Sequence, residues 1–594
     1  MRSRLPILLL AMLLCIAGSA MAADPKPPKD TAQPTGADPE RAGPQQFLPA
    51  KTARAAKAMA VTANPHATGA AVTVLRAGGN AVDAALAAQL VLNVVEPQSS
   101  GIGGGGFMLV YHAATGRVYA LDGRETAPAA MPEDWFLDKA GKPIKFYPHR
   151  ITGGRAVGVP GLLAMLELAR QRFGGKDWVG LSAPAIALAR QGFPVSSRLA
   201  ASLERHKERL GQFPATRKVF FDASGAPLQA GATVRQQELA ATLELLASQG
   251  VDPFYRGAPA RAMVESVREN PVSPGLLTME DMAAYRAVER EPVRFTYRSH
   301  TLLGMGPPSS GAVTAFQMLA LLEHAPPRAS LAQDVHHFAW AAALAYADRG
   351  RYLADADFAQ VPVEGMLHPD YLKTRAGAIQ WSAPLHKVEP GSPPGAATAR
   401  LGTDAHPEAP GTTHLVVADA HGNVVSLTSS IEQAFGSGMV VPGLGFFLNN
   451  QLSDFSPRPR DAEGRPIANR VRGGKRPRSS MAPTIVLKDG KPVLALGSPG
   501  GSRIIQYVAQ VLWRVLAHGN ALPEAVQNPL HTHLGGRTDL EPPLDGNGLP
   551  DALRALGHEV RVRPQGSGLH AVQIGPGGLL GVADPRREGT AAGF

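Results

Sequence analysis

Apolar residues recur at helical spacing over much of the first two thirds of the chain. This spacing predicts one helix at 66–75 and a second at 81–94. The pair Gly78-Gly79 separates the two, and Asn80 is a typical N-terminal cap for the second helix. The same spacing predicts further helices at 162–173, 236–248, 312–322 and 334–348.

Alternating apolar and polar positions are concentrated in two other regions. They predict strands near 107–121 and throughout 412–496. Helices early in the chain and β structure late in the chain favour an α+β fold, with stacked helical layers around two antiparallel sheets.

One alternating run, 411–417, opens on Thr412 directly behind a glycine. A turn-rich segment around His421 follows, and a second alternating run at 424–428 predicts the returning strand of a β-hairpin. Pairing of the two strands would bring Ser430 opposite Thr412. The Ser430 hydroxyl would then bind either the Thr412 hydroxyl or an amine created at Thr412.

The position of Thr412 suggests a chain that cuts itself. A threonine hydroxyl is a poor nucleophile by itself, but a threonine at a chain terminus carries its own amine as an adjacent base. Such an amine titrates near pH 8, so a useful fraction is neutral at physiological pH. Cleavage between Gly411 and Thr412 would therefore create the catalytic group.

Polar side chains gather after the predicted hairpin. Glu432 lies just past it, and Gln451 and Asp454 are spaced so that both can face one pocket. Further on, Ser479 and Ser480 offer paired hydroxyls ahead of another strand. These residues are candidates for substrate binding.

Two more segments carry groups suited to catalysis and binding. Gly500-Gly501 lies in a tight turn, and a glycine pair lets backbone N–H groups approach a reacting carbonyl, as an oxyanion hole requires. Arg124 follows the strand region 107–121 and is a candidate bidentate clamp for a substrate carboxylate.

Taken in order, these motifs resemble those of the γ-glutamyltranspeptidases, a family of N-terminal nucleophile hydrolases. The likeness runs from about Ala60 to the last residue. Its ordered matches are Gly101–Gly106, Gly123–Glu125, Val157–Gly161, Asp281–Tyr285, Pro307–Gly311, Ala347–Arg349, Thr412–His414, Ser479–Met481, Ser498–Arg503 and Asp584–Arg586. The resemblance implies a four-layer αββα sandwich, and a heterodimer made by autocleavage of one precursor.

The resemblance also implies roles in catalysis. Thr412 would be the nucleophile, released by cleavage of the Gly411–Thr412 bond, with the Ser430 hydroxyl beside it. Gly500 and Gly501 would form the oxyanion hole.

For substrate binding, the resemblance implies two subsites. Arg124, Ser479 and Ser480 would hold the α-carboxylate of a γ-glutamyl group. Gln451 and Asp454 would bind its α-amine.

Two positions differ from the pattern common in the family. Ser430 stands where many members carry threonine and keeps the hydroxyl. Glu432 stands where many carry asparagine and adds a second carboxylate near Asp454. That carboxylate would either tighten the grip on an ammonium group or raise a neighbouring carboxyl pKa by repulsion between like charges.

Composition is typical of an exported globular enzyme. The chain has 594 residues, of which 44% are hydrophobic, enough for a large core. A basic start, an apolar run at 5–17 and the segment Ala20-Met21-Ala22 predict a cleavable signal peptide at 1–22. The single cysteine, Cys15, lies inside it, so the mature chain would have neither disulfides nor a catalytic thiol. We expect a periplasmic or secreted protein without a stable membrane anchor.

The rest of the chain is expected to divide at the cleavage point. Residues 23–55, rich in proline and polar residues, predict a disordered linker. The large subunit would span 56–411 and the small catalytic subunit 412–594. A net charge of +10 does not predict nucleic-acid binding, because the arginines are scattered rather than arrayed with aromatic residues along one helix.

Other motifs do not predict a cofactor or a metal. Gly101–Gly106 fits the dinucleotide pattern, but it follows a helical run and precedes a strand, the reverse of the required order. The pairs His336-His337 and His531-x-His533 have no third ligand at suitable spacing. We therefore expect no cofactor and no metal site.

The predicted activity is that of a self-processing γ-glutamyltransferase and glutathione hydrolase. Thr412 would attack a γ-glutamyl amide such as glutathione, and water or an acceptor amino acid or peptide would resolve the acyl-enzyme. Two alternatives remain at this point. One is a glutaryl-type cephalosporin acylase of the same superfamily, and the other is an inactive secreted binding protein with the same fold.

Overall fold

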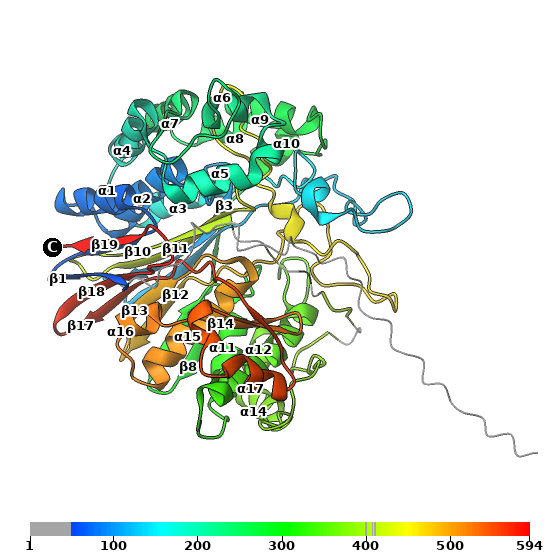
Figure 1. Ribbon diagram of the computed structural model, residues 1–594. Helices are drawn as coiled ribbons and strands as arrows, with labels where there is room; N and C mark the ends of the chain where they lie inside the picture. The colour runs from blue at the N-terminus through cyan, green and yellow to red at the C-terminus, as the bar shows by residue number, and fades with distance from the viewer. Residues whose placement is uncertain (1–48, 398–400, 405, 407, 409–410) are drawn as a thin grey trace, which may run out of the picture. The chain divides into compact units, whose positions relative to one another are not determined.

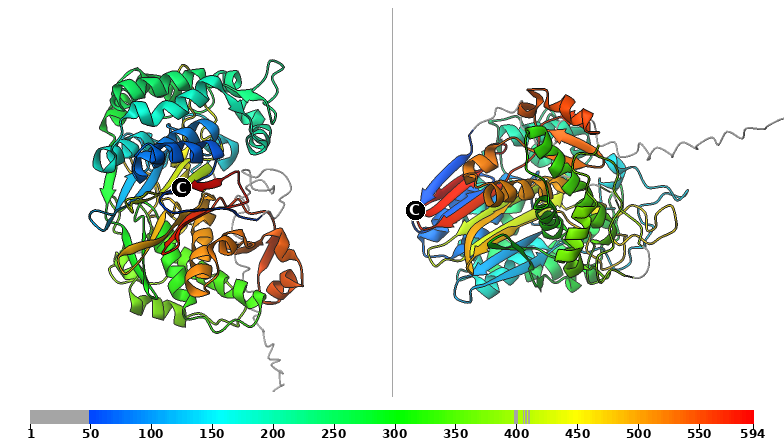
Figure 2. Two further views of the ribbon diagram at one scale, coloured as in Figure 1. Left: turned by 90° about the vertical axis from the view of Figure 1, so that its left-hand side faces the viewer. Right: turned by 90° about the horizontal axis from the view of Figure 1, so that it is seen from below.

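Two seven-stranded antiparallel sheets lie face to face in the computed structural model (Figures 1 and 2). The structure describes residues 49–397, 401–404, 406, 408 and 411–594, which belong to one unit, Ala37–Phe594. The first sheet has the spatial order β19 (Thr590–Gly593), β2 (Met59–Thr62), β10 (Gly411–Ala418), β11 (Val424–Glu432), β3 (Gly105–His112), β4 (Arg117–Gly123) and β7 (Val288–Arg290). The second has the order β1 (Lys51–Ala55), β18 (Gly578–Ala583), β17 (His570–Gly575), β13 (Lys491–Gly497), β12 (Thr484–Lys488), β9 (His300–Gly304) and β8 (Val293–Tyr297).

Helices cover the outer face of each sheet, as Figure 1 shows. On the side of the first sheet lie α1 (Pro65–Arg76), α2 (Ala81–Val95), α3 (Leu162–Phe173), α4 (Trp178–Gln191), α5 (Ser197–Leu210), α6 (Pro214–Phe220), α7 (Gln237–Gln249), α8 (Asp252–Arg256), α9 (Ala258–Arg268) and α10 (Met279–Ala284). On the side of the second lie α11 (Gly311–Leu322), α12 (Leu331–Tyr352), α13 (Val363–Met366), α14 (Pro369–Gly377), α15 (Ile504–Leu512), α16 (Leu522–Gln527) and α17 (Leu549–Ala555). The four layers confirm the predicted αββα sandwich.

Two smaller sheets lie outside these layers. One pairs β14 (His531–Leu534), β15 (Arg537–Leu540) and β16 (Glu559–Val562), and the other pairs β5 (Phe193–Pro194) with β6 (Thr233–Val234).

Strand β10 is buried on both faces. Leu415 and Val417 lie in the hydrophobic cluster shared with the helices over the first sheet. Val416 and Ala418 lie in the cluster between the two sheets. Because successive side chains of a strand point to opposite faces, Thr412 belongs to the inter-sheet side and Thr413 to the helical side.

The predicted helices are confirmed, with ends that shift by a few residues. Helix α2 has the expected N-terminal cap, Asn80. The Asn80 side chain accepts hydrogen bonds from the backbone N–H groups of Val82 and Asp83, and the Asp83 side chain accepts one from the Asn80 N–H. The longest shift is in α12, predicted at 334–348 and observed over Leu331–Tyr352.

The prediction of strands throughout 412–496 is wrong in its middle part. Between β11 and β12, a stretch that the structure describes throughout, there are only isolated bridges and a 3₁₀ turn at Gln451–Asp454. Phe435 and several glycines there have positive φ, a conformation that strands do not use.

The boundary of the predicted linker also needs correction. Lys51–Ala55, assigned to disordered residues 23–55, form β1 and pair with β18 near the C-terminus. The strand is short and largely exposed, so its pairing with a distant segment leaves little trace in the local sequence. The predicted signal peptide, 1–22, lies outside the described residues.

Over the part of the chain that the structure describes, we find no helix with the length and apolar character needed to cross a membrane.

Candidate active site

The hairpin of β10 and β11 sets the predicted nucleophile, Thr412, and Ser430 side by side. Thr412 pairs with Ser430, as the sequence predicted. The Thr412 hydroxyl donates to Ser430 Oγ at 3.2 Å, and the Ser430 hydroxyl donates to the Gly411 carbonyl oxygen at 2.9 Å. Ser430 therefore connects the attacking hydroxyl to the carbonyl of the bond that it would attack.

A bulge at the start of β10 produces this arrangement. The register shifts between Gly411 and Thr412, so that Gly411 faces Glu432 while Thr412 faces Ser430. The Glu432 N–H also donates to Ser430 Oγ at 3.0 Å. A bulge re-aims one peptide group out of the regular ladder, and here it directs the Gly411 carbonyl at a hydroxyl.

Behind the nucleophile, Thr413 joins a buried ion pair. Its hydroxyl donates to Glu96 Oε2 at 2.8 Å, and Glu96 Oε1 accepts from Arg198 Nη1 at 2.6 Å. Arg198 also donates to the Ser99 hydroxyl. Burial raises the pKa of Glu96, although Arg198 opposes that shift. These contacts fix the helical face of β10 next to the scissile bond.

Arg587, near the C-terminus, binds the backbone of Thr412. Its Nη1 donates to the Thr412 carbonyl at 3.0 Å, and its Nη2 donates to the Gly566 carbonyl at 3.1 Å. It also lines a pocket of about 460 Å³ together with Ser196 and Glu588.

The predicted binding residues converge on Arg124. Its Nη2 contacts Asp454 Oδ2 at 2.5 Å and donates to the Arg478 carbonyl at 2.9 Å, while its Nε donates to the Pro477 carbonyl. Burial disfavours the charged guanidinium, but Asp454 and Glu125 outweigh that effect and raise the Arg124 pKa. Arg124 thus ties the loop before Ser479 to the polar cluster around Asp454.

Asp454 is the centre of the predicted amine subsite. Gln451 Nε2 donates to Asp454 Oδ2 at 2.8 Å, and Glu432 interacts with the same carboxyl group. Burial raises the pKa of Asp454, against the pull of Arg124. Asp454 Oδ1 and Gln451 Oε1 are buried without a hydrogen-bond partner among the described residues. Two unpaired acceptors beside a further carboxylate suit a ligand that brings several N–H donors.

Ser479 and Ser480 differ in how their groups are used. Ser479 is held by its backbone, since its carbonyl accepts from the N–H and hydroxyl of Ser310, and its hydroxyl accepts from Met481 N. The Ser480 hydroxyl accepts from Arg349 Nη2 at 2.8 Å. Arg349 Nε also donates to the Ser310 hydroxyl at 2.9 Å, which fixes the guanidinium.

The glycine pair lies between the end of β13, a strand of the second sheet, and the start of α15. Gly500 and Gly501 both have positive φ, and a β-carbon on Gly500 would meet the Tyr507 ring at 2.6 Å. Only glycine fits this turn without strain. Just before it, Gly497 packs against the ring of His414, two residues after the nucleophile.

Residues ahead of the scissile bond also contact the site. Asp404 Oδ2 pairs with Arg478 at 3.0 Å, and His406 Nε2 lies 2.7 Å from Arg150 Nη2. Glu408 contacts Arg349 and accepts from the Ser480 N–H. The sequence analysis did not identify these contacts.

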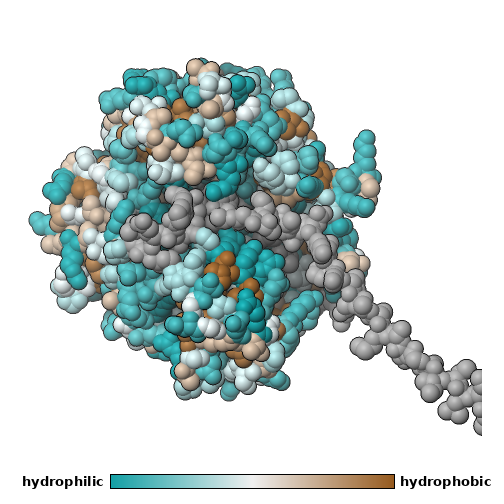
Figure 3. Space-filling model, in the orientation of Figure 1, coloured by the Kyte–Doolittle hydropathy of each residue, from teal (hydrophilic) through white to brown (hydrophobic). Residues whose placement is uncertain are grey.

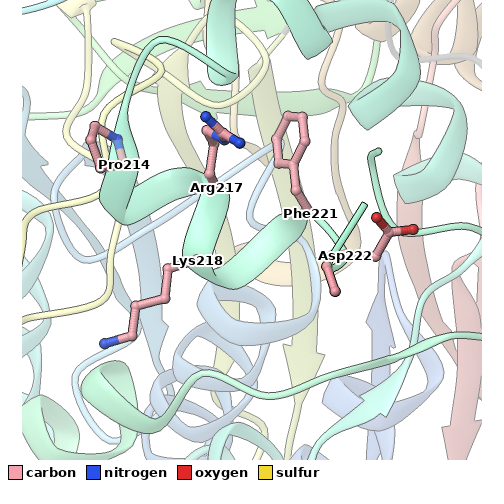
Figure 4. A pocket seen from close by; sticks show the side chains of 6 residues that line it. Pro214, Arg217, Lys218, Phe221 and Asp222 are labelled. Carbon is pink, nitrogen blue, oxygen red and sulfur yellow. The ribbon is translucent and has the colours of Figure 1, made fainter. Parts of the chain in front are cut away.

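Every predicted side chain of the site is buried in this uncut chain. The exposed fraction is 1% for Arg124, 2% for Thr412 and 3% for Asp454. The surface offers other hollows, such as the pocket of about 500 Å³ around α6 (Figure 4), which none of the predicted site residues lines. The face in Figure 3 is mainly hydrophilic, and the large hydrophobic residues exposed among the described residues are Val179, Val272 and Leu331.

The motifs set aside in the sequence analysis have structural roles here. Gly103 and Gly104 pack against the backbone of Phe447 and Ser430, where a β-carbon would lie 2.3 Å from a carbonyl oxygen. His336 contacts His558, which contacts Thr538 in the small sheet. Within the described ranges, no group of three or more His, Cys, Asp or Glu residues is arranged to hold a metal ion.

The structure brings most of the predicted residues together, but the sequence analysis missed their supports. Glu96, Arg198, Arg349, Glu408 and Arg587 all contact a predicted site residue. Arg349 lies inside the matched motif Ala347–Arg349, so the sequence did point to it, but residue spacing alone did not indicate its role.

Comparison with known proteins gives the same assignment along most of the chain. Residues 67–594 match the family model described as Gamma-glutamyltranspeptidase. The glutathione hydrolase proenzyme of Bacillus subtilis (strain 168) is 39% identical over 555 residues, covering 90% of this chain and 91% of that protein. The acylase ACY 1 proenzyme of Pseudomonas sp. (strain SE83) is 35% identical over 555 residues, covering 91% and 94%.

A solved structure supports the fold. The cephalosporin acylase from Bacillus halodurans superposes with a TM-score of 0.80 at 27% identity, covering 93% of this chain and 98% of that chain.

Proposed function

This chain belongs to the γ-glutamyltranspeptidase family, and on that basis we propose that it is an autoprocessing γ-glutamyltransferase and glutathione hydrolase. The observation that carries the proposal is the hydrogen-bonded series from the Thr412 hydroxyl through Ser430 to the Gly411 carbonyl. It sets the predicted nucleophile beside the one peptide bond whose cleavage would free its amine.

Self-cleavage follows from this series as an N-to-O acyl shift. Thr412 Oγ1 bonds to the Gly411 carbonyl carbon as its proton passes to Ser430 Oγ, and Ser430 passes its own proton on to the Gly411 oxygen, which neutralises the developing oxyanion. That proton then moves from the oxygen to the Thr412 nitrogen as the C–N bond breaks and the carbonyl re-forms, so that an ester joins Gly411 to Thr412. Water hydrolyses the ester, leaving a carboxylate on Gly411 and a primary amine on Thr412.

In the mature enzyme the same hydroxyl would attack the γ-glutamyl amide. The Thr412 amine would take the hydroxyl proton and return it to the leaving amine, and Gly500 and Gly501 would donate backbone N–H groups to the oxyanion. Water or an acceptor amino acid or peptide then releases the glutamyl group. These reaction steps need no cofactor.

The two substrate subsites are proposed from the polar clusters. Arg124, Ser479 and Ser480 would bind the α-carboxylate, since guanidinium and hydroxyl groups donate hydrogen bonds to carboxylates. Gln451, Asp454 and Glu432 would bind the α-ammonium.

The rival reaction is hydrolysis of a glutaryl side chain, and it is weighed because two of the similar proteins are named as acylases, one of them a cephalosporin acylase. A glutaryl group has no α-amine, so it would leave the buried Asp454 Oδ1 without a donor. We therefore expect γ-glutamyl p-nitroanilide to be turned over faster than glutaryl p-nitroanilide. Preference for the glutaryl compound would reverse the assignment.

The decisive experiment follows the Thr412–Gly411 bond. We expect the purified wild-type chain to give two bands on a denaturing gel, with Thr-Thr-His at the new N-terminus, and Thr412→Ala to give one band and no turnover. A wild-type chain that stays whole would favour an inactive binding protein, and a Thr412→Ala chain that still splits at 411 would refute the mechanism.

The subunits and location belong to the same proposal. Cleavage would give a large subunit ending at Gly411 and a small subunit of 412–594 that contribute residues to one site, because β10 and β11 pair inside a sheet built from both. Export to the periplasm or the medium is proposed from the sequence of 1–22. Mass spectrometry of the mature protein tests both the leader and the cleavage point.

A further inference from the structure

Glu408 lies four residues before the nucleophile, and its carboxylate is buried among the groups of the candidate site. It is 7% exposed. One oxygen contacts Arg349 Nη2, and the other accepts from the Ser480 N–H at 2.6 Å. Glu408 also acts electrostatically on Arg124 and Asp454. A carboxylate of the chain therefore occupies the Ser480 N–H, one of the groups that the proposed function assigns to a substrate carboxylate, and it acts on Arg124, another of them.

The backbone of Glu408 is fixed as well. Its N–H donates to the Ser502 hydroxyl at 2.7 Å, and its carbonyl accepts from the Ser502 N–H at 3.3 Å. Ser502 directly follows the glycine pair Gly500-Gly501. Glu408 thus connects the carboxylate-binding groups to the glycine turn by both its side chain and its main chain.

Glu408 does not act alone ahead of the scissile bond. Asp404, His406 and Glu408 are alternate residues, and each contacts a buried arginine: Arg478, Arg150 and Arg349 respectively. Three such contacts within a few residues restrict where the following Gly411–Thr412 bond can lie. Holding a reacting bond in place lowers the entropic part of its barrier.

From these contacts we infer that Glu408 is a positioning residue for self-cleavage, and that its carboxylate fills the α-carboxylate subsite until the chain is cut. The subsite then serves two ligands in turn, first Glu408 and later the α-carboxylate of a γ-glutamyl substrate. The identity of the second ligand rests on the proposed function, whereas the role of Glu408 in cleavage does not.

The first test measures cleavage. Wild type, Glu408→Ala, Glu408→Gln and the control Glu389→Ala are translated in a cell-free system, and the fraction cut at 411 is followed on denaturing gels. Glu389 is a matched control because it is an exposed glutamate whose carboxylate pairs with the exposed Lys387. We expect Glu408→Ala to slow cleavage about tenfold or more, the cost of a hydrogen bond to a charged group. Glu408→Gln should be intermediate, and Glu389→Ala should match wild type.

The second test measures access to the subsite. Binding of L-glutamate to the uncut Thr412→Ala chain is compared, by calorimetry, with binding to Thr412→Ala/Glu408→Ala. We expect the double variant to bind about tenfold more tightly or better, because the carboxylate-binding groups are then unoccupied. A purely structural role for Glu408 would not produce a gain of binding.

Each outcome decides a separate point. Wild-type cleavage rates in both Glu408 variants would overturn the positioning role, and equal L-glutamate affinity in the two uncut chains would overturn the occupancy. If Glu408→Ala gives no cooperative thermal unfolding, Glu408→Gln, which keeps the size of the side chain, decides the first point. Failure of the wild-type chain to split, or of the mature enzyme to act on γ-glutamyl amides, would instead count against the proposed function.

Discussion

At the scale of single residues, Ser430 is the group on which self-cleavage depends most directly. It accepts from Thr412 and donates to Gly411, so removal of its hydroxyl breaks the proton path and leaves the carbonyl without its donor. We expect Ser430→Ala to slow cleavage about 10²-fold, the cost of losing one donor to an oxyanion. Ser430→Thr keeps the hydroxyl and should cleave within a few-fold of wild type. Fragment formation over time, read on gels, tests both, and rapid cleavage of Ser430→Ala would exclude the relay.

Glu432 combines an unusual backbone with an unusual side chain. Its φ is +76°, a left-handed conformation that costs a residue with a β-carbon about 1 kcal/mol. Glu432→Asn should raise the unfolding free energy by part of that amount, because asparagine tolerates the conformation better. Denaturant unfolding of the uncut Thr412→Ala chain measures this.

The same change should weaken amine recognition. Glu432→Asn removes one of the two carboxylates near the proposed ammonium position, so KM for a γ-glutamyl anilide should rise about fivefold. The glutaryl anilide, which has no amine, should not lose rate. Glu432→Gly separates the two effects, since it relieves the strain completely but supplies no acceptor; an unchanged KM in both variants would remove Glu432 from the subsite.

At the scale of elements, β10 has a separate task on each face. Its inter-sheet face presents Thr412, and its helical face anchors Thr413 to Glu96 at the end of α2. Thr413→Val keeps the shape but leaves a buried carboxylate oxygen without its donor. We expect a loss of about 1–3 kcal/mol in unfolding free energy, measured by denaturant titration in the Thr412→Ala background. Thr413→Ser should restore most of it, and no loss in the valine variant would mean that the contact is dispensable.

The elements also show what sequence patterns can predict. Helix α2 and the β10–β11 hairpin were predicted with their cap and register, because a capping box and a strand–turn–strand pattern are local signals. Strand β1 was missed, since its partner β18 lies more than five hundred residues away along the chain. The stretch between β11 and β12 was assigned to strands, although its positive φ values produce turns.

At the scale of the whole molecule, buried histidines predict an acid limit to stability. His533 and His558, in and beside the small sheet, form a hydrogen-bonded series with Thr538 and with His336 of α12. Burial is the main cause that lowers their pKa, to about 4 for His533 and about 3 for His558, from the ordinary value of 6.5. Both are neutral when folded at pH 7.

The direction in which stability changes with pH follows from which state, folded or unfolded, binds more protons. Between pH 6.5 and the lowered values, the unfolded chain binds protons that the folded chain does not, so stability falls as the pH falls through that window. Each of the two histidines contributes up to about 1.4 kcal/mol per pH unit. Unfolding free energies at several pH values from 7.5 to 5 measure the slope.

A variant pair measures the share of one of these histidines in that slope. Other buried histidines also have a lowered pKa, among them His206, His531 and His570, so His558→Gln should reduce the slope by up to about 1.4 kcal/mol per pH unit without abolishing it. His66→Gln, which changes an exposed histidine, should leave the slope unchanged. An equal slope in both variants would place the acid sensitivity elsewhere.

The sequence by itself determined the fold class, and it supplied the proposed cleavage point and the candidate site residues, because glycine, threonine and paired polar residues at fixed local spacing carry their chemistry with them. Only the tertiary structure decided what surrounds those groups. The contacts of Glu96 with Thr413, Arg349 with Ser480 and Arg587 with Thr412 join residues more than a hundred positions apart. Such pairs leave no periodic trace in one sequence, since burial and charge pairing depend on which faces the folded layers bring together.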